Sequence, residues 1–104
     1  MKAAIARPTR RRRGARLVDC LTLWLSNLMH AERNVARETS RLAETLAGQK
    51  SPVVLVTNEV GLGIVPDNAL ARRFRDAAGV MNQMIASVAD EVEFVVAGLP
   101  MRVK

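Results

Sequence analysis

Two apolar runs of the sequence each end in polar side chains that could bind a nucleotide or a metal ion. Asp19 closes a short run, and Asn58-Glu59 follows the run at residues 53–57. A lone carboxylate at the end of a buried strand is costly unless it meets a cation or hydrogen-bond donors. Asp19 could therefore hold Mg²⁺, directly or through water, or accept a hydrogen bond from a ribose hydroxyl. It could also simply cap a helix that begins near Thr22.

The loop after the second run contains two glycines that would let a ligand approach the backbone. Gly61 and Gly63 lie three and five residues after Asn58. The loop does not fit the dinucleotide-binding pattern G-x-G-x-x-G, because Pro66 stands at the third glycine position. We expect Gly61 and Gly63 to join Asn58 and Glu59 in a nucleotide pocket, and a plain turn remains the alternative.

Four other residues carry side chains that could take part in binding or catalysis. Arg72 and Arg73 could contact phosphates from the start of a helix, although charged stretches on helices are usually solvated faces. His30 is the only histidine and has no acid or cysteine at metal-ligand spacing, so a structural role is expected. Cys20, the only cysteine, is expected to be a buried structural thiol. The sequence contains no G-x-x-x-x-G-K-[ST] loop to cradle a triphosphate.

Hydrophobic periodicity predicts the elements that must position these residues. We expect a strand ending near Asp19, a helix over about residues 23–47 and a strand at 53–57. A second helix would follow Asp67 as its N-cap, and a last strand would cover residues 92–97. Alternating strands and helices predict an α/β fold with right-handed crossovers and a parallel sheet. Ligands bind outside the carboxyl ends of such strands, where Asp19, Asn58 and Glu59 are expected to converge.

The net charge of +6 is concentrated at one end of the chain. Seven of the 16 basic residues and none of the 10 acidic ones lie in residues 1–16, so the remainder is nearly neutral. This basic head could be a solvated tail or a misassigned start, and a nucleic-acid arm or a targeting segment are the alternatives. The apolar run after it is interrupted by Asp19 and Asn27 and is too short to span a bilayer. We expect a single cytoplasmic domain without disulfides.

Several stretches, in order and at matching spacing, resemble one enzyme family. Residues 17–27 read LVDCLTLWLSN, residues 54–66 read VLVTNEVGLGIVP, and residues 71–76 read ARRFRD. The likeness continues through Gly79, Asn82-Gln83, Ala89-Asp90 and the ending VAGLP at residues 96–100. From about residue 16 onward, the chain resembles the bifunctional adenosylcobinamide kinase/adenosylcobinamide-phosphate guanylyltransferases.

The resemblance implies an enzyme of cobalamin biosynthesis. Such enzymes phosphorylate adenosylcobinamide with ATP or GTP and then use GTP to form adenosylcobinamide-GDP, passing GMP through a histidine. The implied cofactors are GTP, ATP and Mg²⁺, and the implied assembly is a homotrimer with no membrane partner. Asp19 matches the family's acidic residue at the nucleotide site, so the resemblance assigns it GTP contact or Mg²⁺ support.

Residues 1–15 do not resemble the family. In the family, the phosphate loop and the histidine come before the part that residues 16–104 resemble. The resemblance therefore implies an incomplete P-loop NTPase-like (RecA-like) fold, with a basic head at residues 1–15 and the carboxyl-terminal part of the domain at 16–104. His30 cannot replace the missing nucleophile, because it follows Asp19 whereas the family's histidine precedes that position. We expect the isolated chain to be inactive, unless a separate chain supplies the missing parts. The alternative function is a non-catalytic module whose basic arm binds nucleic acid or another polyanion, whereas no nucleic-acid partner is expected for the enzyme.

Overall fold

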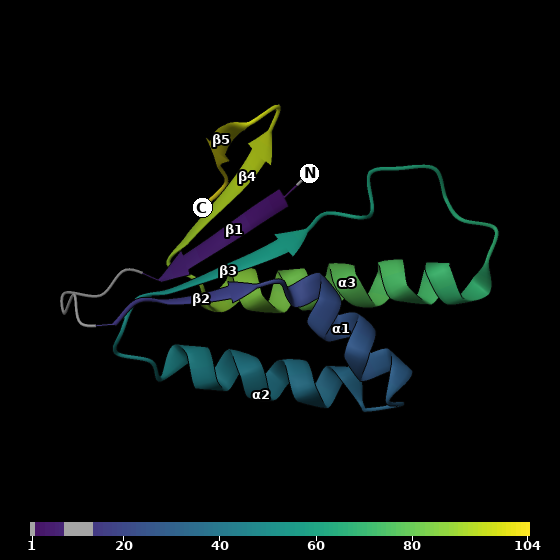
Figure 1. Cartoon of the computed structure of the whole chain (residues 1–104), viewed down its shortest axis with the longest axis horizontal. Coiled ribbons are helices and arrows are strands. Elements are labelled where there is room, and N and C mark those ends of the chain that lie inside the picture. The colour runs from purple at the N-terminus through teal and green to yellow at the C-terminus, as the bar shows by residue number, and fades with distance from the viewer. Residues whose placement is uncertain (1, 8–13) are drawn as a thin grey trace.

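The described residues form three helices and a five-stranded sheet. A computed structural model describes residues 2–7 and 14–104 (Figure 1). The α/β class expected from the sequence is confirmed. The elements are, in chain order, β1 (Lys2–Arg7), β2 (Arg16–Asp19), α1 (Leu21–His30), α2 (Val35–Ala47), β3 (Val53–Asn58), α3 (Ala69–Val88), β4 (Glu91–Val96) and β5 (Leu99–Arg102).

The sheet is mixed, which corrects the expectation of a parallel sheet. Its strand order is β2-β3-β1-β4-β5. Only β2 and β3 pair in parallel, whereas β1 is antiparallel to both β3 and β4, and β5 is antiparallel to β4. The three expected strands do run in one direction. The position between β3 and β4 is taken by β1, which runs against them.

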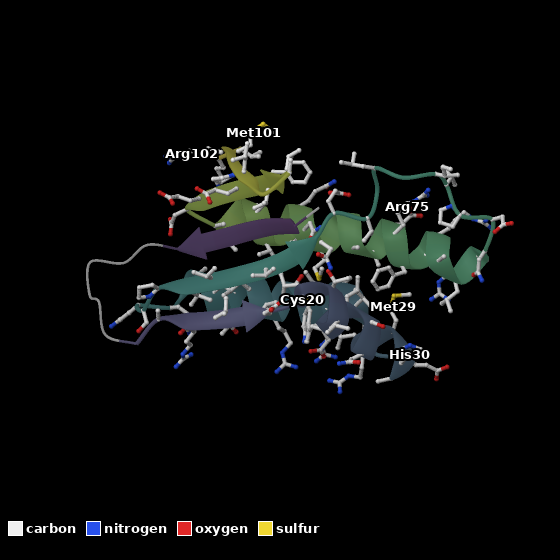
Figure 2. The ribbon with its side chains drawn as sticks, turned by 45° about the horizontal axis from the view of Figure 1, so that its top comes forward. Cys20, Met29, His30, Arg75, Met101 and Arg102 are labelled. Carbon is white, nitrogen blue, oxygen red and sulfur yellow. The ribbon has the colours of Figure 1, made fainter. Side chains whose placement is uncertain are left out.

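All three helices cover the same face of the sheet. The connections β2–α1–α2–β3 and β3–α3–β4 both advance toward β5, and right-handed crossovers in one direction place their helices on one side. Figure 2 shows the sheet in front of α3. In β3, the alternate residues Val53, Leu55 and Thr57 are only 3%, 2% and 1% exposed, while Val54 and Val56 on the opposite face are half-buried. The core therefore lies between the sheet and the helices.

The core combines apolar side chains from every described helix. Leu21 and Leu25 of α1, Leu46 of α2, and Met81 and Ile85 of α3 are at most 7% exposed. Their spacing along α3 follows the helical period, which explains why this helix was predictable. Among the described helices, none is long and apolar enough to cross a membrane.

The single long helix expected over residues 23–47 is two helices. The chain leaves the helical conformation after His30, and Glu32 has a φ of 54°, in the left-handed region. Helix α2 then begins after Asn34, whose side chain accepts a hydrogen bond from the Arg37 N–H at 3.0 Å. The apolar stripe continues across the break, so periodicity alone could not locate it.

The other helix boundary and the carboxyl terminus also differ from expectation. Asn68, not Asp67, caps α3, because its Oδ1 accepts from the N–H groups of Leu70 and Ala71 at 2.8 and 3.2 Å. After β4 the chain reverses through Ala97 and Gly98, with φ values of 52° and 75°, and returns as β5. Two successive residues with positive φ are the hallmark of a tight β-hairpin turn.

Part of the basic head belongs to the sheet. Residues 2–7 form β1 at its centre, although the sequence places residues 1–15 in a tail outside the domain. β1 pairs with β3 on one side and with β4 on the other. This pairing is made by backbone hydrogen bonds, so the basic composition of the segment does not predict it. The arginine run at residues 10–13 lies outside the described residues.

The cap assignment predicts unequal effects of two neighbouring substitutions. Asn68→Ala should lower the free energy of unfolding by about 1 kcal/mol, because two N–H groups of the first turn lose their acceptor. Asp67→Ala should change it by less than about 0.5 kcal/mol. Urea unfolding measures the free energy of unfolding of both variants. A larger decrease for Asp67→Ala would show that Asp67, and not Asn68, is the N-cap.

Two glycines should respond to alanine with opposite signs. Gly98→Ala should destabilise the protein by about 1 kcal/mol, because alanine is strained at a φ of 75° even though nothing lies within 4 Å of the new Cβ. Gly79→Ala, in the middle of α3 with equally open space, should stabilise it by about 0.5–1 kcal/mol. Thermal unfolding should shift down for the first variant and up for the second. Shifts of the same sign would contradict the assigned hairpin turn.

Candidate functional site

The structure brings Asp19 and Asn58 to the same edge and face of the sheet. They are the last residues of the adjacent parallel strands β2 and β3, in which Asp19 is aligned with Val56. Because side chains alternate along a strand, Asp19, Val56 and Asn58 share one face. Thr57 lies on the opposite face, against the helices. The predicted convergence of Asp19 and Asn58 therefore exists, on the face that none of the described helices covers.

The Asp19 carboxylate is free to meet a ligand. Its side chain is exposed, and it forms no hydrogen bond or ion pair with any other residue in the described ranges. The alternative role as a helix cap is wrong, because α1 begins at Leu21 and its N-cap is Cys20, which makes no side-chain cap bond. Cys20 is partly buried, at the junction of β2 and α1 (Figure 2).

Side chains from two helices hold the backbone of Asn58. Thr22 Oγ1, in the first turn of α1, accepts from the Asn58 N–H at 2.9 Å. Asn82 Nδ2, from α3, donates to the Asn58 carbonyl at 3.5 Å, and Asn82 Oδ1 accepts from the Thr57 hydroxyl at 2.8 Å. The peptide groups on both sides of Asn58 are thus fixed, which sets the direction in which its side chain leaves the strand.

Sequence reasoning about the site missed Thr22, Thr57 and Asn82. A faint signal exists, because Thr57 is a hydroxyl at the end of an apolar run and Asn82 follows the buried Ala78 by one helical turn. The sequence does not show that Thr57 and Asn82 are partners, because they meet only when β3 packs against α3.

The Glu59 side chain is hydrogen-bonded to the backbone of the loop that follows it. Its Oε1 accepts from the Gly61 N–H at 2.7 Å, and a Cβ at Gly61 would lie 2.9 Å from that oxygen. Gly61 is therefore suited to this close approach, whereas Gly63 is exposed with nothing within 4 Å of a built Cβ. The loop runs outward between β3 and α3 (Figure 1) and exposes Ile64 almost fully.

Arg72 and Arg73 lie away from Asp19. Arg72 Nη1 donates to the Pro66 carbonyl at 2.9 Å, which ties α3 to the preceding loop. Arg73 lines a pocket of about 380 Å³ between α1 and α3, together with His30 and Phe74. His30 is exposed at the last residue of α1. This pocket is on the helix side of the sheet, whereas Asp19 and Asn58 are on the other side.

A magnesium ion would need ligands from outside the described residues. Within the described part of the chain, no group of three or more His, Cys, Asp or Glu side chains could hold a metal ion. Magnesium is usually held by one or two carboxylates together with substrate phosphates and water. The exposed Asp19 carboxylate fits the role of a single protein ligand to a phosphate-bound Mg²⁺, with Asn58 beside it.

Comparison with known proteins agrees with the resemblance in the sequence. The chain matches the cobinamide kinase / cobinamide phosphate guanyltransferase family over residues 1–103. It is similar to the bifunctional adenosylcobalamin biosynthesis protein CobP of Pseudomonas aeruginosa, with 47% identity over 90 residues covering 85% of this chain and 52% of the relative. It is also similar to CobU of Salmonella typhimurium and of Escherichia coli, at 42% and 38% identity, each match covering 85% of this chain and 57% of the relative.

The chain belongs to the cobinamide kinase / cobinamide phosphate guanyltransferase family, as the resemblance predicted. Its relatives are named as bifunctional adenosylcobalamin biosynthesis proteins. The chain spans about half the length of the curated relatives it matches. The family match begins at residue 1, so it does not distinguish residues 1–15 from residues 16–104.

The hydrogen bond between Thr57 and Asn82 should be detectable as a coupling energy. Asn82→Ala should destabilise the protein by about 1–3 kcal/mol, because the Thr57 hydroxyl, only 1% exposed, loses its acceptor. Thr57→Val combined with Asn82→Ala should cost less than the sum of the two single changes, by about 0.5–3 kcal/mol. Urea unfolding of the double-mutant cycle measures this coupling. Strict additivity would show that the two side chains do not interact.

Proposed function

We propose that this chain forms the carboxyl-terminal part of an enzyme that makes adenosylcobinamide-GDP. The enzyme would phosphorylate adenosylcobinamide with ATP or GTP and then transfer GMP from GTP to the product. The observation that carries the proposal is the pair of polar strand ends, with Asp19 and Asn58 on one face at the carboxyl edge of parallel strands. Nucleotides bind at this edge in α/β sheets.

The complete enzyme would have a P-loop NTPase-like (RecA-like) fold, of which residues 16–104 are one part. Phosphoryl transfer depends mainly on positioning and on stabilising negative charge. In this proposal the chain contributes Asp19 to the nucleotide-bound Mg²⁺, which neutralises phosphate charge, while Asn58 and the loop at Glu59, Gly61 and Gly63 line the nucleotide pocket. The backbone bonds from Thr22 and Asn82 hold Asn58 in place.

The phosphate-binding loop and the GMP-accepting histidine would come from another segment. The sequence holds no G-x-x-x-x-G-K-[ST] motif, and its one histidine, His30, lies on the helix side of the sheet. We therefore propose that the chain alone does not transfer phosphate or GMP. Homotrimer formation and a cytoplasmic location remain parts of the same proposal. Membership of this family favours the enzyme over the alternative of a polyanion-binding module.

A hybrid protein tests this function directly. The whole chain, including β1, would replace the matching part of CobP from Pseudomonas aeruginosa, and formation of adenosylcobinamide-GDP would be measured. We expect the hybrid to be active and the isolated chain to be inactive. Asp19→Asn in the hybrid should lower kcat by about 10²-fold, because a charged group at the phosphates is lost.

Asp67→Asn is the matched control, because Asp67 is an exposed aspartate in the loop before α3. It should leave kcat unchanged. A folded hybrid with no activity, or equal losses for the two aspartates, would contradict the proposed function. GMP transfer by the isolated chain would contradict the proposed division of the enzyme.

A further inference from the structure

A cleft of about 280 Å³ lies between α2 and α3, on the helix side of the sheet. The two helices run side by side (Figure 1), and the cleft opens beside the first two turns of α2. Its walls are apolar except for Thr39 and Asp76. The apolar residues that line it are Val35, Ala36, Ala77, Val80, Met81 and Met84. The cleft can therefore hold a small apolar body, and only two of its side chains can form hydrogen bonds.

Thr39 has a buried hydroxyl with no hydrogen-bond partner among the described residues. The residue is only 1% exposed, and its Oγ1 neither donates to nor accepts from any described group. A threonine inside a helix can bond to the carbonyl four residues earlier, which here would be that of Val35, but this bond is absent among the described contacts. An unpaired buried hydroxyl destabilises the folded chain. A ligand that bonds to Thr39 from the cleft would remove this destabilisation.

The Asp76 carboxylate in the cleft wall is already paired. Its Oδ1 accepts from Nε and Nη2 of Arg75 at 3.1 and 3.0 Å, and its side chain is 69% exposed. Thr39 is thus the one unpaired polar side chain among the described residues that line the cleft. A buried water molecule needs several polar partners. The cleft therefore favours a ligand with an apolar body and a single hydrogen-bonding group over water.

Two methionines in the cleft favour an aromatic ring as the apolar body. Met81 and Met84 both belong to α3 and line the same space as Thr39. A thioether sulfur makes favourable contacts with aromatic rings, and the unbranched methionine side chain adapts its shape to what it packs against. Met84 is half-buried, so it can move aside and uncover the Thr39 hydroxyl. Since an apolar cavity of about 150 Å³ accepts benzene, this cleft has room for a single ring.

We propose that the cleft between α2 and α3 binds a small aromatic molecule that carries one hydrogen-bonding group. The ring packs against Ala77 and the two methionines, and its hydroxyl or N–H group pairs with Thr39 Oγ1. This site is separate from Asp19 and Asn58, which lie on the opposite face of the sheet, and it does not depend on the proposed function. Because the ligand touches both helices, its binding stabilises the folded chain.

Titration with phenol and toluene tests the inference, because phenol carries a hydroxyl where toluene carries a methyl group. NMR shifts of the Ala77 and Met84 methyl groups in the full chain measure both Kd values. The ratio of the toluene Kd to the phenol Kd should fall by about fivefold or more in Thr39→Val, because only phenol pairs with the threonine hydroxyl. Thr45→Val is the control, since Thr45 is exposed on the same helix and bonds to the Arg41 carbonyl. It should change the ratio by less than about twofold.

Thermal unfolding provides a second measurement. Thr39→Val should raise Tm by about 4 °C or more, because it removes an unpaired hydroxyl and keeps the shape of the side chain. Phenol should raise the Tm of the unchanged chain more than that of Thr39→Val, because it binds the unchanged chain more tightly. A lower Tm for Thr39→Val would show that the hydroxyl is bonded in the folded chain and would overturn the inference.

The hybrid protein carries α2 and α3 whole, so the same titration can be made on it if the isolated chain does not fold. A ratio that falls in Thr39→Val but not in Thr45→Val supports the inference in either protein. Val80→Trp, at a wall position that is 54% exposed, should weaken the binding of both molecules by covering the cleft. An unchanged ratio in Thr39→Val, unchanged binding in Val80→Trp, or no saturable binding of phenol by the folded protein would overturn the inference.

Discussion

Both crossover connections of the sheet run in the same direction, and this constraint determines where the helices, the core and the candidate site lie. From β2 to β3 and from β3 to β4 the chain advances in the same direction, so right-handed crossovers place α1, α2 and α3 on one face. The core forms on that face, around Leu25 and Ile85, which are fully buried. The other face is left with Leu17, Val54 and Val56. Because side chains alternate along β2 and β3, the same constraint directs Asp19 and Asn58 toward the uncovered side.

Alternation also places the two polar residues at the end of β3 on opposite faces of the sheet. Thr57 faces the helices and is bound to Asn82, whereas Asn58 faces away and, among the described residues, is held through its backbone. The buried hydroxyl thus anchors the strand end, and no described side chain holds the amide of Asn58 at the candidate site. Glu59 and Gly61 then stabilise the start of the outgoing loop through a bond of 2.7 Å.

Much of the fold could be predicted because the period of the apolar residues is local information. The runs that became β2 and β3 and the stripe of α3 were all recognisable, and so was the placement of Asp19 and Asn58 at strand ends. The break between α1 and α2 could not be predicted, because its positive φ occurs at Glu32, and glutamate is not a residue type that indicates a left-handed conformation. The same is true of Ala97 in the hairpin. The place of β1 in the sheet depends on partners distant in sequence.

The arginines show a different limit of sequence reasoning. Arg72 and Arg73 begin the helix that follows the glycine loop, and this order suggested phosphate contacts. In the folded chain, Arg72 is bonded to Pro66 and Arg73 lines the pocket beside α1. The direction of a side chain around a helix depends on how that helix packs, which sequence order does not specify. The resemblance identified the family, and the packing located a face of the sheet that no described helix covers.

Thiol labelling of two adjacent β3 residues tests whether the helices cover one face of the sheet and leave the other accessible. In a Cys20→Ser background, Leu55→Cys and Val56→Cys would place one thiol on the helix-covered face and one on the face that no described helix covers. Val56→Cys should be labelled rapidly, whereas Leu55→Cys should be labelled slowly, through opening of the core. Equally slow labelling of the two thiols would contradict the one-sided packing of the helices.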